Sequence, residues 1–428
     1  MPYQSITPLR HRYLQRDYLG NRDDDADPLG AYYEDVHQWA RTAKTRMHIH
    51  CQCLLKAAVN PRLMSAAIDQ IGGWKALEDY DEGGFCHWEA LRGLRNDVLS
   101  GLFRRGEYRR VKIPKPGKTG FRTIEIPDSD SRILARNLCT LLTPLLDPDF
   151  YQLSIGFRPS RSIAHGLAAA KHLVGTGKHF MVACDVKDAF GSIPKSRLIQ
   201  MLRKRLHQSP VINLIEELLD RQRTRGIPQG LSLSPICLNV YLDHVFDRWW
   251  LEKFSHATLI RYADDIAVFT DSRNDAEAAY EAICKRLLPT GLQIKESQQQ
   301  AIWDLADDFP VEWLGFGLTA RSGELEASLS ESAWHKLEAA LASAKVRQKF
   351  RNLDLNRDQS DMGFQWIVQR AVAIPESSIK DIAGRICLMA DRAGLSMDSL
   401  DEEEASRAWR IGRKQAKRAA GSVSGWLV

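Results

Sequence analysis

The sequence predicts an α+β fold in which a small sheet is covered by helices on one face. Segments with the pattern of strands occur near 107–127, 179–186 and 257–271, and helical patterns separate them. The apolar spacing is helical again early in the chain and after about residue 330. This order, with a hairpin placed between helices, is typical of a sheet whose helices are segregated to one side.

The composition is that of an ordinary globular protein. The chain has 428 residues, enough for a large core and two or three structural units, and 44% of them are apolar. Its net charge of 59 − 54 = +5 is too mild to identify a partner. The first residues are too polar for a signal peptide, and no apolar run reaches the roughly 18 residues of a membrane span. We therefore expect an intracellular, cytoplasmic protein without membrane contacts, whose eight cysteines are reduced.

Elements in the first half of the chain follow from apolar spacing and from proline and glycine. Residues 31–105 show helical spacing after a polar start. In 107–127, two short alternating stretches flank the sequence PGKTG, which predicts a hairpin. Helices are expected near 130–145 and from Arg161 onward. The apolar run HFMVACDV predicts a buried strand that ends at Asp185.

The second half of the chain continues this alternation. A helix opens at Pro194, and an amphipathic helix follows the glycine-framed loop GIPQG. The sequence ATLIRYADDIAVFTD at 257–271 predicts two strands joined by a tight turn. A helix near 274–288, a strand near Gln293 and the strand pair VEWLGFGLTA follow. The chain then becomes helical and contains a basic segment at 407–418.

Three aspartates stand at the ends of the predicted strands. Asp185 ends the buried strand, and Asp264 and Asp265 lie in the turn of the later hairpin. Each alone is explained by a turn or a helix cap, because aspartate tolerates both. Charge at the ends of buried strands nevertheless needs a partner or a metal. Phosphoryl transfer uses two divalent ions about 4 Å apart, and Mg²⁺ prefers oxygen ligands from converging carboxylates.

Six segments in order resemble the sequence boxes of reverse transcriptases. The resemblance covers about 107–318, half of the chain, and each box alone is much less specific than the ordered set. The six segments are KPGKTGFR at 115–122, SIGFRPSRS at 154–162, DVKDAF at 185–190, IPQG with SP at 227–235, YADD at 262–265 and WLGF at 313–316. The second segment is similar to that of bacterial and group II intron-type enzymes.

The resemblance implies a right-hand polymerase fold of fingers, palm and thumb with a helical N-terminal extension. The expected divisions are 1–105 for the extension, 106–182 for the fingers, 183–320 for the palm with the helices of 195–225 as an insertion, and 321–428 for the thumb and the basic C-terminal segment. The implied activity is that of an RNA-directed DNA polymerase, a nucleotidyltransferase. The implied partners are an RNA template, an RNA–DNA hybrid and deoxynucleoside triphosphates, with two Mg²⁺ ions for which Mn²⁺ can substitute.

The resemblance also assigns roles to residues. The catalytic carboxylates are Asp185, Asp264 and Asp265, and the metal ligands are these three and the carbonyl of Val186. The nucleotide-binding residues are Lys115, Arg122, Phe190, Gln229 and Gly230. The residues expected to contact nucleic acid are Lys112, Arg158, Arg161, Trp313 and Gly315. The lysines and arginines are alternatively a solvated face, and Phe190 is alternatively a core aromatic.

The sequence departs from the family pattern at two positions. Gly191 stands after Phe190, where the family often has an acidic residue. Gln298 stands near the place of a family lysine that donates a proton to pyrophosphate. Lys295 is either a replacement for that lysine or a surface residue.

Several kinds of reverse transcriptase are compatible with these boxes. Ser234-Pro235 disfavours diversity-generating retroelements, and the signatures of retron enzymes are missing. We expect a stand-alone bacterial enzyme in antiviral defence, whose N-terminal extension contacts a dedicated noncoding RNA. The alternatives are a group II intron-type maturase and a catalysis-independent RNA-binding scaffold. Phe190 disfavours a viral-type RNA-dependent RNA polymerase, because an aromatic gate excludes the ribose 2′-hydroxyl.

Overall fold

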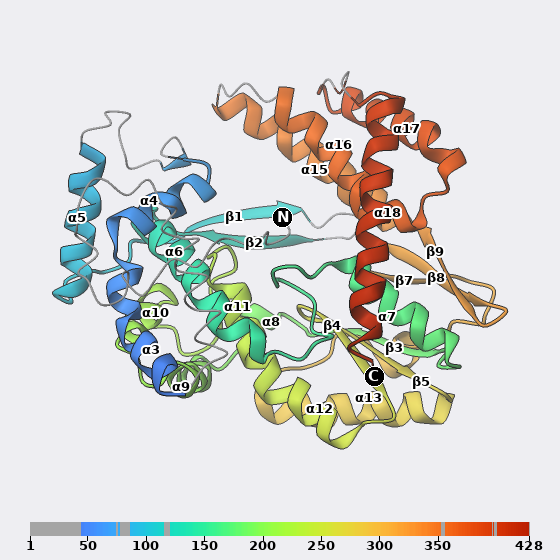
Figure 1. Ribbon diagram of the computed structural model, residues 1–428, viewed down its shortest axis with the longest axis horizontal. Coiled ribbons are helices and arrows are strands. Elements are labelled where there is room, and N and C mark those ends of the chain that lie inside the picture. Colours follow the sequence, from blue (N-terminus) through green and yellow to red (C-terminus); the bar gives the residue numbers. More distant parts are fainter. Residues whose placement is uncertain are drawn as a thin grey trace.

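Figure 1 shows the computed structural model of the protein, which describes residues 44–73, 76–77, 86–114, 120–351, 356–395, 397 and 400–427. Helices and small sheets are mixed along this part of the chain, which confirms the α+β class. No helix among the described residues is both long enough and apolar enough to cross a bilayer.

The first helices of the described chain share a core with the long helix α6. These elements are α3 (Lys44–Ala58), α4 (Pro61–Gln70), α5 (Cys86–Leu99) and α6 (Ser129–Leu146). Asn60 caps α4, since its side chain accepts hydrogen bonds from the backbone of Arg62 at 2.9 Å and Leu63 at 3.3 Å. The proline that follows suits the first helical position, where no backbone donor is needed.

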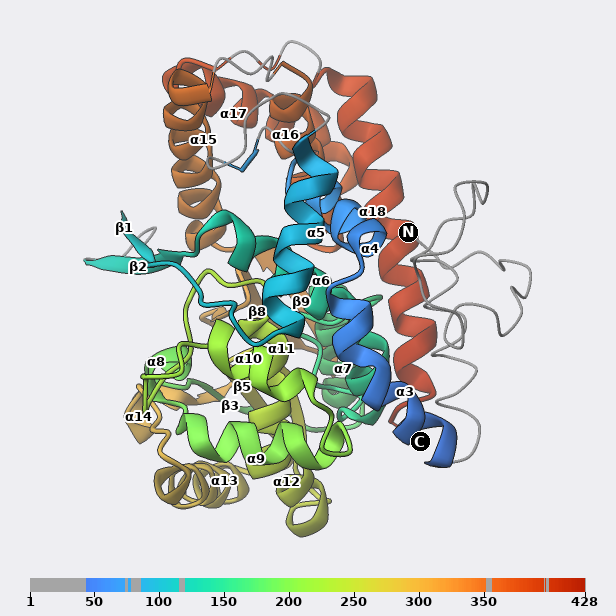
Figure 2. The same ribbon diagram turned by 90° about the vertical axis from the view of Figure 1, so that its left-hand side faces the viewer.

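A two-stranded hairpin projects from the body of the protein, as Figure 2 shows. Strands β1 (Arg109–Pro114) and β2 (Phe121–Ile126) pair in antiparallel register, with Lys112 opposite Thr123. The predicted hairpin is therefore confirmed. Lys115 belongs to the tip of this hairpin and lies outside the described residues.

The central sheet positions the three aspartates. It has the strand order β4-β5-β3-β6 with every pair antiparallel. Its strands are β3 (Phe180–Asp185), β4 (Thr258–Tyr262), β5 (Asp265–Thr270) and β6 (Ile302–Asp304). No strand forms near Gln293; the neighbouring Ile294 makes only an isolated bridge with Val186, and β6 takes the edge instead.

Both faces of the central sheet are buried. Alternate residues of β3 enter two different cores: Val182 and Cys184 join one, and Met181 joins the other. Helix α13 (Arg273–Leu287) packs against β3 and β5, and α7 (Ile163–Gly175) packs against β4. Burial on two faces explains why these strands read as continuous apolar runs.

A second sheet contributes to the core that contains α7. Its strands are β7 (Val311–Trp313), β8 (Phe316–Arg321) and β9 (Glu324–Leu329), in sequence order. Leu314 and Gly315 form the two-residue turn between β7 and β8 with φ of 51° and 84°. Positive φ at both positions is the geometry of a type I′ turn, which favours glycine. The expected strand pair VEWLGFGLTA is therefore confirmed.

The remaining helices surround the sheets and form a C-terminal layer. Those near the sheet are α8 (Ala189–Ser192), α9 (Lys195–Arg205), α10 (Val211–Leu218), α11 (Ser234–Leu242), α12 (Arg248–Lys253) and α14 (Gln298–Ala301), with a π-helical segment Asp243–Asp247 between α11 and α12. The C-terminal helices are α15 (Glu331–Arg351), α16 (Asn356–Arg370), α17 (Ile379–Arg392) and α18 (Glu402–Ser424). Helix α18 runs from this layer down to α7 (Figure 1).

Candidate active site

The register of the central sheet brings the three aspartates to one end of it. Asp185, the last residue of β3, lies directly opposite Asp265, the first residue of β5. Asp264 precedes Asp265 in the two-residue turn, and its carbonyl accepts a hydrogen bond from the backbone of Val186 at 3.0 Å. Strand pairing alone therefore joins the DVKDAF and YADD segments, as the sequence predicted.

The turn that carries Asp264 is held in a demanding conformation. Ala263 has a φ of 58°, in the left-handed region that residues with a Cβ avoid. Gly156 lies against this turn, and a Cβ there would overlap the backbone nitrogen of Ala263. The adjoining Ile155 donates a backbone hydrogen bond to the carbonyl of Arg261 at 2.8 Å. The glycine of the SIGFRPSRS segment is thus required by close backbone packing.

A buried ion pair supports the same turn from beneath. Arg261 and Asp247 are both 0% exposed, and two nitrogens of the Arg261 guanidinium donate to the Asp247 carboxylate at 2.8 and 2.5 Å. The third nitrogen donates to the carbonyl of Ala263 at 2.7 Å and to Asn239 at 3.0 Å. Desolvation raises the pKa of Asp247, and the charge of Arg261 offsets part of that rise. Sequence analysis missed this pair, although an arginine inside the apolar run ATLIRY was a signal.

Asp185 is held by a lysine and by a second carboxylate. Lys295 lies 3.2 Å from the Asp185 carboxylate and 3.3 Å from that of Glu296. Glu296 also accepts a hydrogen bond from the backbone of Asp185 at 2.7 Å. Desolvation lowers the pKa of Lys295, but the charges of Asp185 and Glu296 outweigh it and the pKa is raised. Gln298, in contrast, begins α14. No sequence motif pointed to the contact that Glu296 makes with Asp185.

Asp265 is the most strongly perturbed acid of the site. Desolvation and the negative charge of Asp185 raise its pKa to about 8, although a hydrogen bond from the Trp313 indole at 2.9 Å opposes the rise. Desolvation also raises the pKa of Asp264, and the positive charge of Arg122 partly opposes it. Carboxylates with raised pKa in one small region indicate a functional site.

Two residues of the WLGF segment that are expected to contact nucleic acid are buried. Trp313 is only 2% exposed, and its indole nitrogen donates to Asp265. Gly315 is buried within the β7–β8 turn. The nucleic-acid contacts of both residues stay predictions, and the contact of Trp313 that the structure shows is its hydrogen bond to the Asp265 carboxylate.

Arg158, which is also expected to contact nucleic acid, is buried as well. Its side chain is 2% exposed, and all five of its N–H groups are used. They donate to the side chain and carbonyl of Asp147 and to the carbonyls of Tyr151 and Ser154, at 2.7 to 3.3 Å. Arg158 therefore fixes the loop before α7, whereas Arg161 and Lys112 remain outside the core.

Four of the residues expected at the nucleotide lie on β2, on α8 and in the IPQG loop. Arg122 is exposed on β2, and its charge acts on Asp264. Phe190 is half-buried in α8 and its carbonyl accepts a hydrogen bond from the backbone of Ile227 at 2.8 Å. Gln229 accepts a 2.7 Å hydrogen bond from the backbone of Glu125, which joins the loop to β2. Gly230 has a φ of 134°, and a Cβ there would lie 2.5 Å from the Glu125 carbonyl.

At Gly191, a Cβ would meet the carboxylate of Asp188, so a larger residue at this position would require the Asp188 side chain to move. Asp188 is the residue before α8 and has a φ of 46°. The carboxylate of Asp188 is therefore the acidic group that lies beside position 191.

The donors at this end of the sheet are oxygens, which suit a hard divalent cation. In the part of the chain that the structure describes, no three carboxylate, imidazole or thiol groups are already close enough together to hold an ion. The ion pair with Lys295 occupies Asp185 instead. The residue types fit Mg²⁺, and the side chains would have to turn toward it.

About half of this chain matches a known protein family. Residues 113–318 match the family described as "Reverse transcriptase (RNA-dependent DNA polymerase)". The chain is similar to Protein YkfC of Escherichia coli strain K12, with 31% identity over 178 residues, which are 38% of this chain and 46% of that protein. It is also similar to the group II intron-encoded protein LtrA of Lactococcus lactis subsp. cremoris, with 27% identity over 187 residues, 42% of this chain and 31% of that protein.

The chain spans less than half the length of both of these relatives. Among solved structures, telomerase from Candida albicans in complex with a fragment of telomeric RNA aligns with a TM-score of 0.41 and 12% identity. That alignment covers 74% of this chain and 62% of the telomerase chain.

Proposed function

Residues 113–318 make this chain a member of the reverse transcriptase family, and we propose that it synthesises DNA on an RNA template by two-metal nucleotidyl transfer. Its fold is the right-hand polymerase fold. The observation that carries the proposal is the direct pairing of Asp185 with Asp265, with Asp264 in the adjoining turn. Strand pairing thereby brings acids from two strands and a turn to the same end of the sheet.

The division of the chain into functional parts belongs to this proposal. We assign 106–182 to the fingers, 183–320 to the palm with an insertion at 195–225, 321–428 to the thumb with the basic C-terminal segment, and 1–105 to an N-terminal extension. The β1–β2 hairpin supports the fingers assignment, because it projects from the body of the protein (Figure 2) and the charge of Arg122 on β2 acts on Asp264.

The carboxylates would hold two Mg²⁺ ions, for which Mn²⁺ can substitute. The ligands would be Asp185, Asp264, Asp265 and the carbonyl of Val186. When bound, the ions neutralise charge on the attacking and leaving oxygens. The hydrogen bond from Trp313 would orient the Asp265 carboxylate, and the hydrogen bond from Arg261 to the Ala263 carbonyl would hold the backbone of the turn. Neither residue need touch the substrate to affect the reaction.

The incoming deoxynucleotide would lie between the hairpin and the sheet. Lys115 and Arg122 would bind its triphosphate, since cations stabilise the charge that develops there. Phe190 would exclude a ribose 2′-hydroxyl and so select deoxynucleotides. Gln229 and Gly230 would lie against the new base pair, which the exposed position of Gly230 on the loop beside β2 supports.

Lys295 would deliver the proton to the pyrophosphate leaving group. Its support is its place at 3.2 Å from Asp185, whereas Gln298 has no acidic proton. Its raised pKa keeps it protonated at neutral pH. With Asp185 serving as a metal ligand, the Lys295 ammonium group would be available to the leaving group.

A primer-extension assay tests the main proposal. We expect the purified protein to extend a DNA primer on an RNA template with dNTPs and to require Mg²⁺. Asp264→Ala with Asp265→Ala should abolish extension but leave RNA binding within about twofold, because the acids contact metal rather than the phosphate backbone. Incorporation of rNTPs alone would contradict the proposal and favour an RNA-dependent RNA polymerase.

We further propose that the template is a dedicated noncoding RNA and that the activity serves antiviral defence. The Ser234-Pro235 sequence supports a stand-alone enzyme over a diversity-generating one. Sequencing the RNA that copurifies with the protein tests the template. Phage plating on cells with the wild-type protein or the Asp264→Ala, Asp265→Ala variant tests the role, and equal plaque numbers would contradict it.

A second candidate is a maturase of the group II intron type. The 27% identity with the intron-encoded LtrA favours it. In that case the copurifying RNA should be an intron, and splicing should depend on the protein. Splicing or defence that survives loss of both turn aspartates would instead indicate a scaffold that binds RNA without synthesis.

A further inference from the structure

The C-terminal helix α18 has two opposite faces of different character. One face packs into the protein through small residues, namely Ala405, Ala408, Gly412, Ala419 and Val423. The other face is exposed and carries six cations, here called the basic face: Arg407, Arg410, Arg413, Lys414, Lys417 and Arg418. At 3.6 residues per turn these six lie within an arc of about 140° and over about 17 Å of helix.

The fold does not account for most of the basic face. Arg407 pairs with Glu404 at 2.9 Å, and Arg413 lies over the ring of Trp409. None of the ion pairs found in the described part of the chain includes the other four cations. The negative end of the helix dipole would favour cations in the last turn, but that turn has none. Like charges this close repel one another unless a polyanion binds them.

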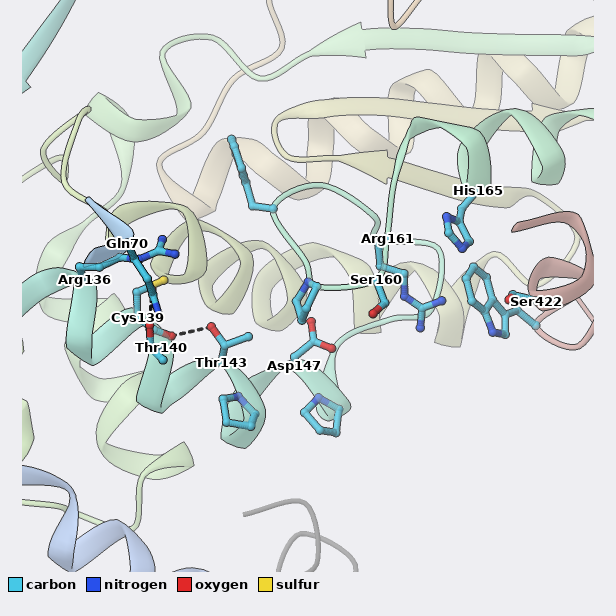
Figure 3. Close-up of a pocket in the computed structure, with 15 residues that line it drawn as sticks. Gln70, Arg136, Cys139, Thr140, Thr143, Asp147, Ser160, Arg161, His165 and Ser422 are labelled. Carbon is cyan, nitrogen blue, oxygen red and sulfur yellow. Dashed lines mark hydrogen bonds between the residues drawn. The ribbon is translucent and has the colours of Figure 1, made fainter. Parts of the chain in front are cut away.

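A pocket opens at the C-terminal end of α18, between α6 and the loop before α7 (Figure 3). Its volume is about 680 Å³. The guanidinium of Arg161 lies 3.7 Å from the centre of the Trp426 ring, and the ring of His165 is stacked on Trp426 at 5.3 Å with 13° between the planes. Desolvation lowers the pKa of Arg161 to about 10, so it remains charged, and lowers that of His165 to about 4. Arg161 and His165 both lie against the Trp426 ring, so a nucleobase that stacks on this ring would take the place of one of them, with the Arg161 cation left to contact its phosphate.

One wall of this pocket belongs to the loop that supports the catalytic turn. Phe157 and Ser160 in this loop have φ of 57° and 58°, so the loop is strained at two positions. Phe157 is 51% exposed, and its ring lies 6.4 Å from that of Tyr262. The exposed Phe157 ring adds another aromatic group to the lining of this pocket.

We propose that the basic face and the pocket bind a structured RNA outside the catalytic cleft, with duplex phosphates along α18 and an unpaired base against Trp426. In Figure 2, α18 lies along one side of the molecule, and α8 and α14, which flank the acids, lie on the other. A duplex carries a charge per about 1.7 Å, so about 17 Å of helix meets on the order of ten charges. The inference rests on the proposed function only in naming RNA as the nucleic acid.

The probe is an RNA hairpin with a single-stranded extension, and its Kd is measured over a range of KCl. Arg410→Gln with Lys414→Gln and Lys417→Gln should weaken binding about tenfold or more at physiological salt and reduce the salt slope by about 2. The matched control replaces three exposed lysines on other helices, Lys204, Lys253 and Lys285, by glutamine and should bind as the wild type does. Unchanged binding by the α18 variant would overturn the proposal.

Two further arms separate the pocket from the helix and RNA from DNA. Trp426→Ala should weaken binding of the hairpin with the extension but not of the blunt hairpin, and Trp426→Phe should restore it. An equal loss for both hairpins would overturn the assignment of the pocket. A DNA hairpin of the same sequence should be bound more weakly by the wild type. Equal affinity, with an equal loss on substitution, would overturn the assignment to RNA.

Extension of oligo(dT) on poly(rA) distinguishes this inference from the proposed function. The α18 triple variant should extend this unstructured template within about twofold of wild type. A matching loss in both assays would place α18 in the template path, or reflect a folding defect, and would overturn the inference. If the wild type itself fails to extend, the proposed function fails, while the hairpin titrations still decide whether α18 binds RNA.

Discussion

Replacing Asp265 by asparagine should stabilise the metal-free protein, and the gain should grow between pH 6 and pH 8. The pKa of Asp265 is raised to about 8 by desolvation and by the charge of Asp185. Asparagine has nearly the same shape and retains an oxygen that can accept the hydrogen bond from Trp313. Asparagine carries no charge and does not titrate. The substitution therefore removes only the free-energy cost that a buried acid beside another acid adds to folding.

The sign and size follow from proton linkage. Below about pH 8 the folded protein keeps the proton on Asp265, whereas the unfolded chain, with a pKa near 3.8, has lost it. The free energy of unfolding therefore falls as the pH rises, by at most about 1.4 kcal/mol per unit. Between pH 6 and pH 8 a single site of this kind contributes about 2 kcal/mol.

The assay compares melting temperatures of wild type and Asp265→Asn at both pH values without divalent ions. The comparison is needed because His165 acts in the opposite direction. Its pKa is lowered to about 4, so the stability from its neutral form is lost as the pH falls through 6.5. The two proteins share that effect, and it cancels in their difference.

We expect Asp265→Asn to melt a few degrees above wild type at pH 8 and closer to it at pH 6. Adding Mg²⁺ should stabilise the wild type more than the variant, since the ion compensates the charge that asparagine lacks. An identical pH dependence in the two proteins, or a variant less stable than wild type at pH 8, would refute the linkage between burial and charge at this site.

Three further predictions concern residues around the acids. Arg261→Met should cost about 3–5 kcal/mol of stability, because it leaves Asp247 buried without its partner. Adding Asp247→Asn should recover stability but not DNA synthesis, because the Ala263 carbonyl still lacks its donor. A fully active double variant would contradict this. Lys295→Gln should lower the single-turnover rate constant of nucleotide addition by about 100-fold, and Lys295→Arg should shift the pH dependence of that rate constant to higher pH. An unchanged rate constant would make Lys295 a surface lysine. Phe190→Val should reduce dNTP over rNTP selectivity about 10- to 100-fold, the size of a relieved steric clash, and no change would assign it to the core.

The catalytic acids could be predicted from sequence because local rules position them. A buried strand that ends at Asp185 and a tight hairpin around Asp264 and Asp265 are both visible as apolar runs with a turn between them. Antiparallel pairing of β3 with β5 then places Asp185 directly opposite Asp265. The sequence order of the boxes supplied the remaining constraint.

The groups that tune the acids could not be predicted, because they come from distant parts of the chain. Trp313 reaches Asp265 across 48 positions, and Glu296 reaches the backbone of Asp185 across 111. Arg158 shows the same limit. Its place in the SIGFRPSRS segment predicts a nucleic-acid contact but does not reveal that its N–H groups donate to Asp147, Tyr151 and Ser154. Only the packed structure shows which arginines have N–H groups that are not already hydrogen-bonded within the protein.

The negative charge of the three acids is offset by a different means at each acid. Asp185 is paired with Lys295, the charge of Arg122 partly opposes the rise in the pKa of Asp264, and the pKa of Asp265 is raised to about 8. Under the proposed function, a metal ion at these acids would compete with the Lys295 ammonium group and with the Asp265 proton, so metal affinity should rise with pH. Lys295, once separated from Asp185, would then be available for the proton donation proposed for it above.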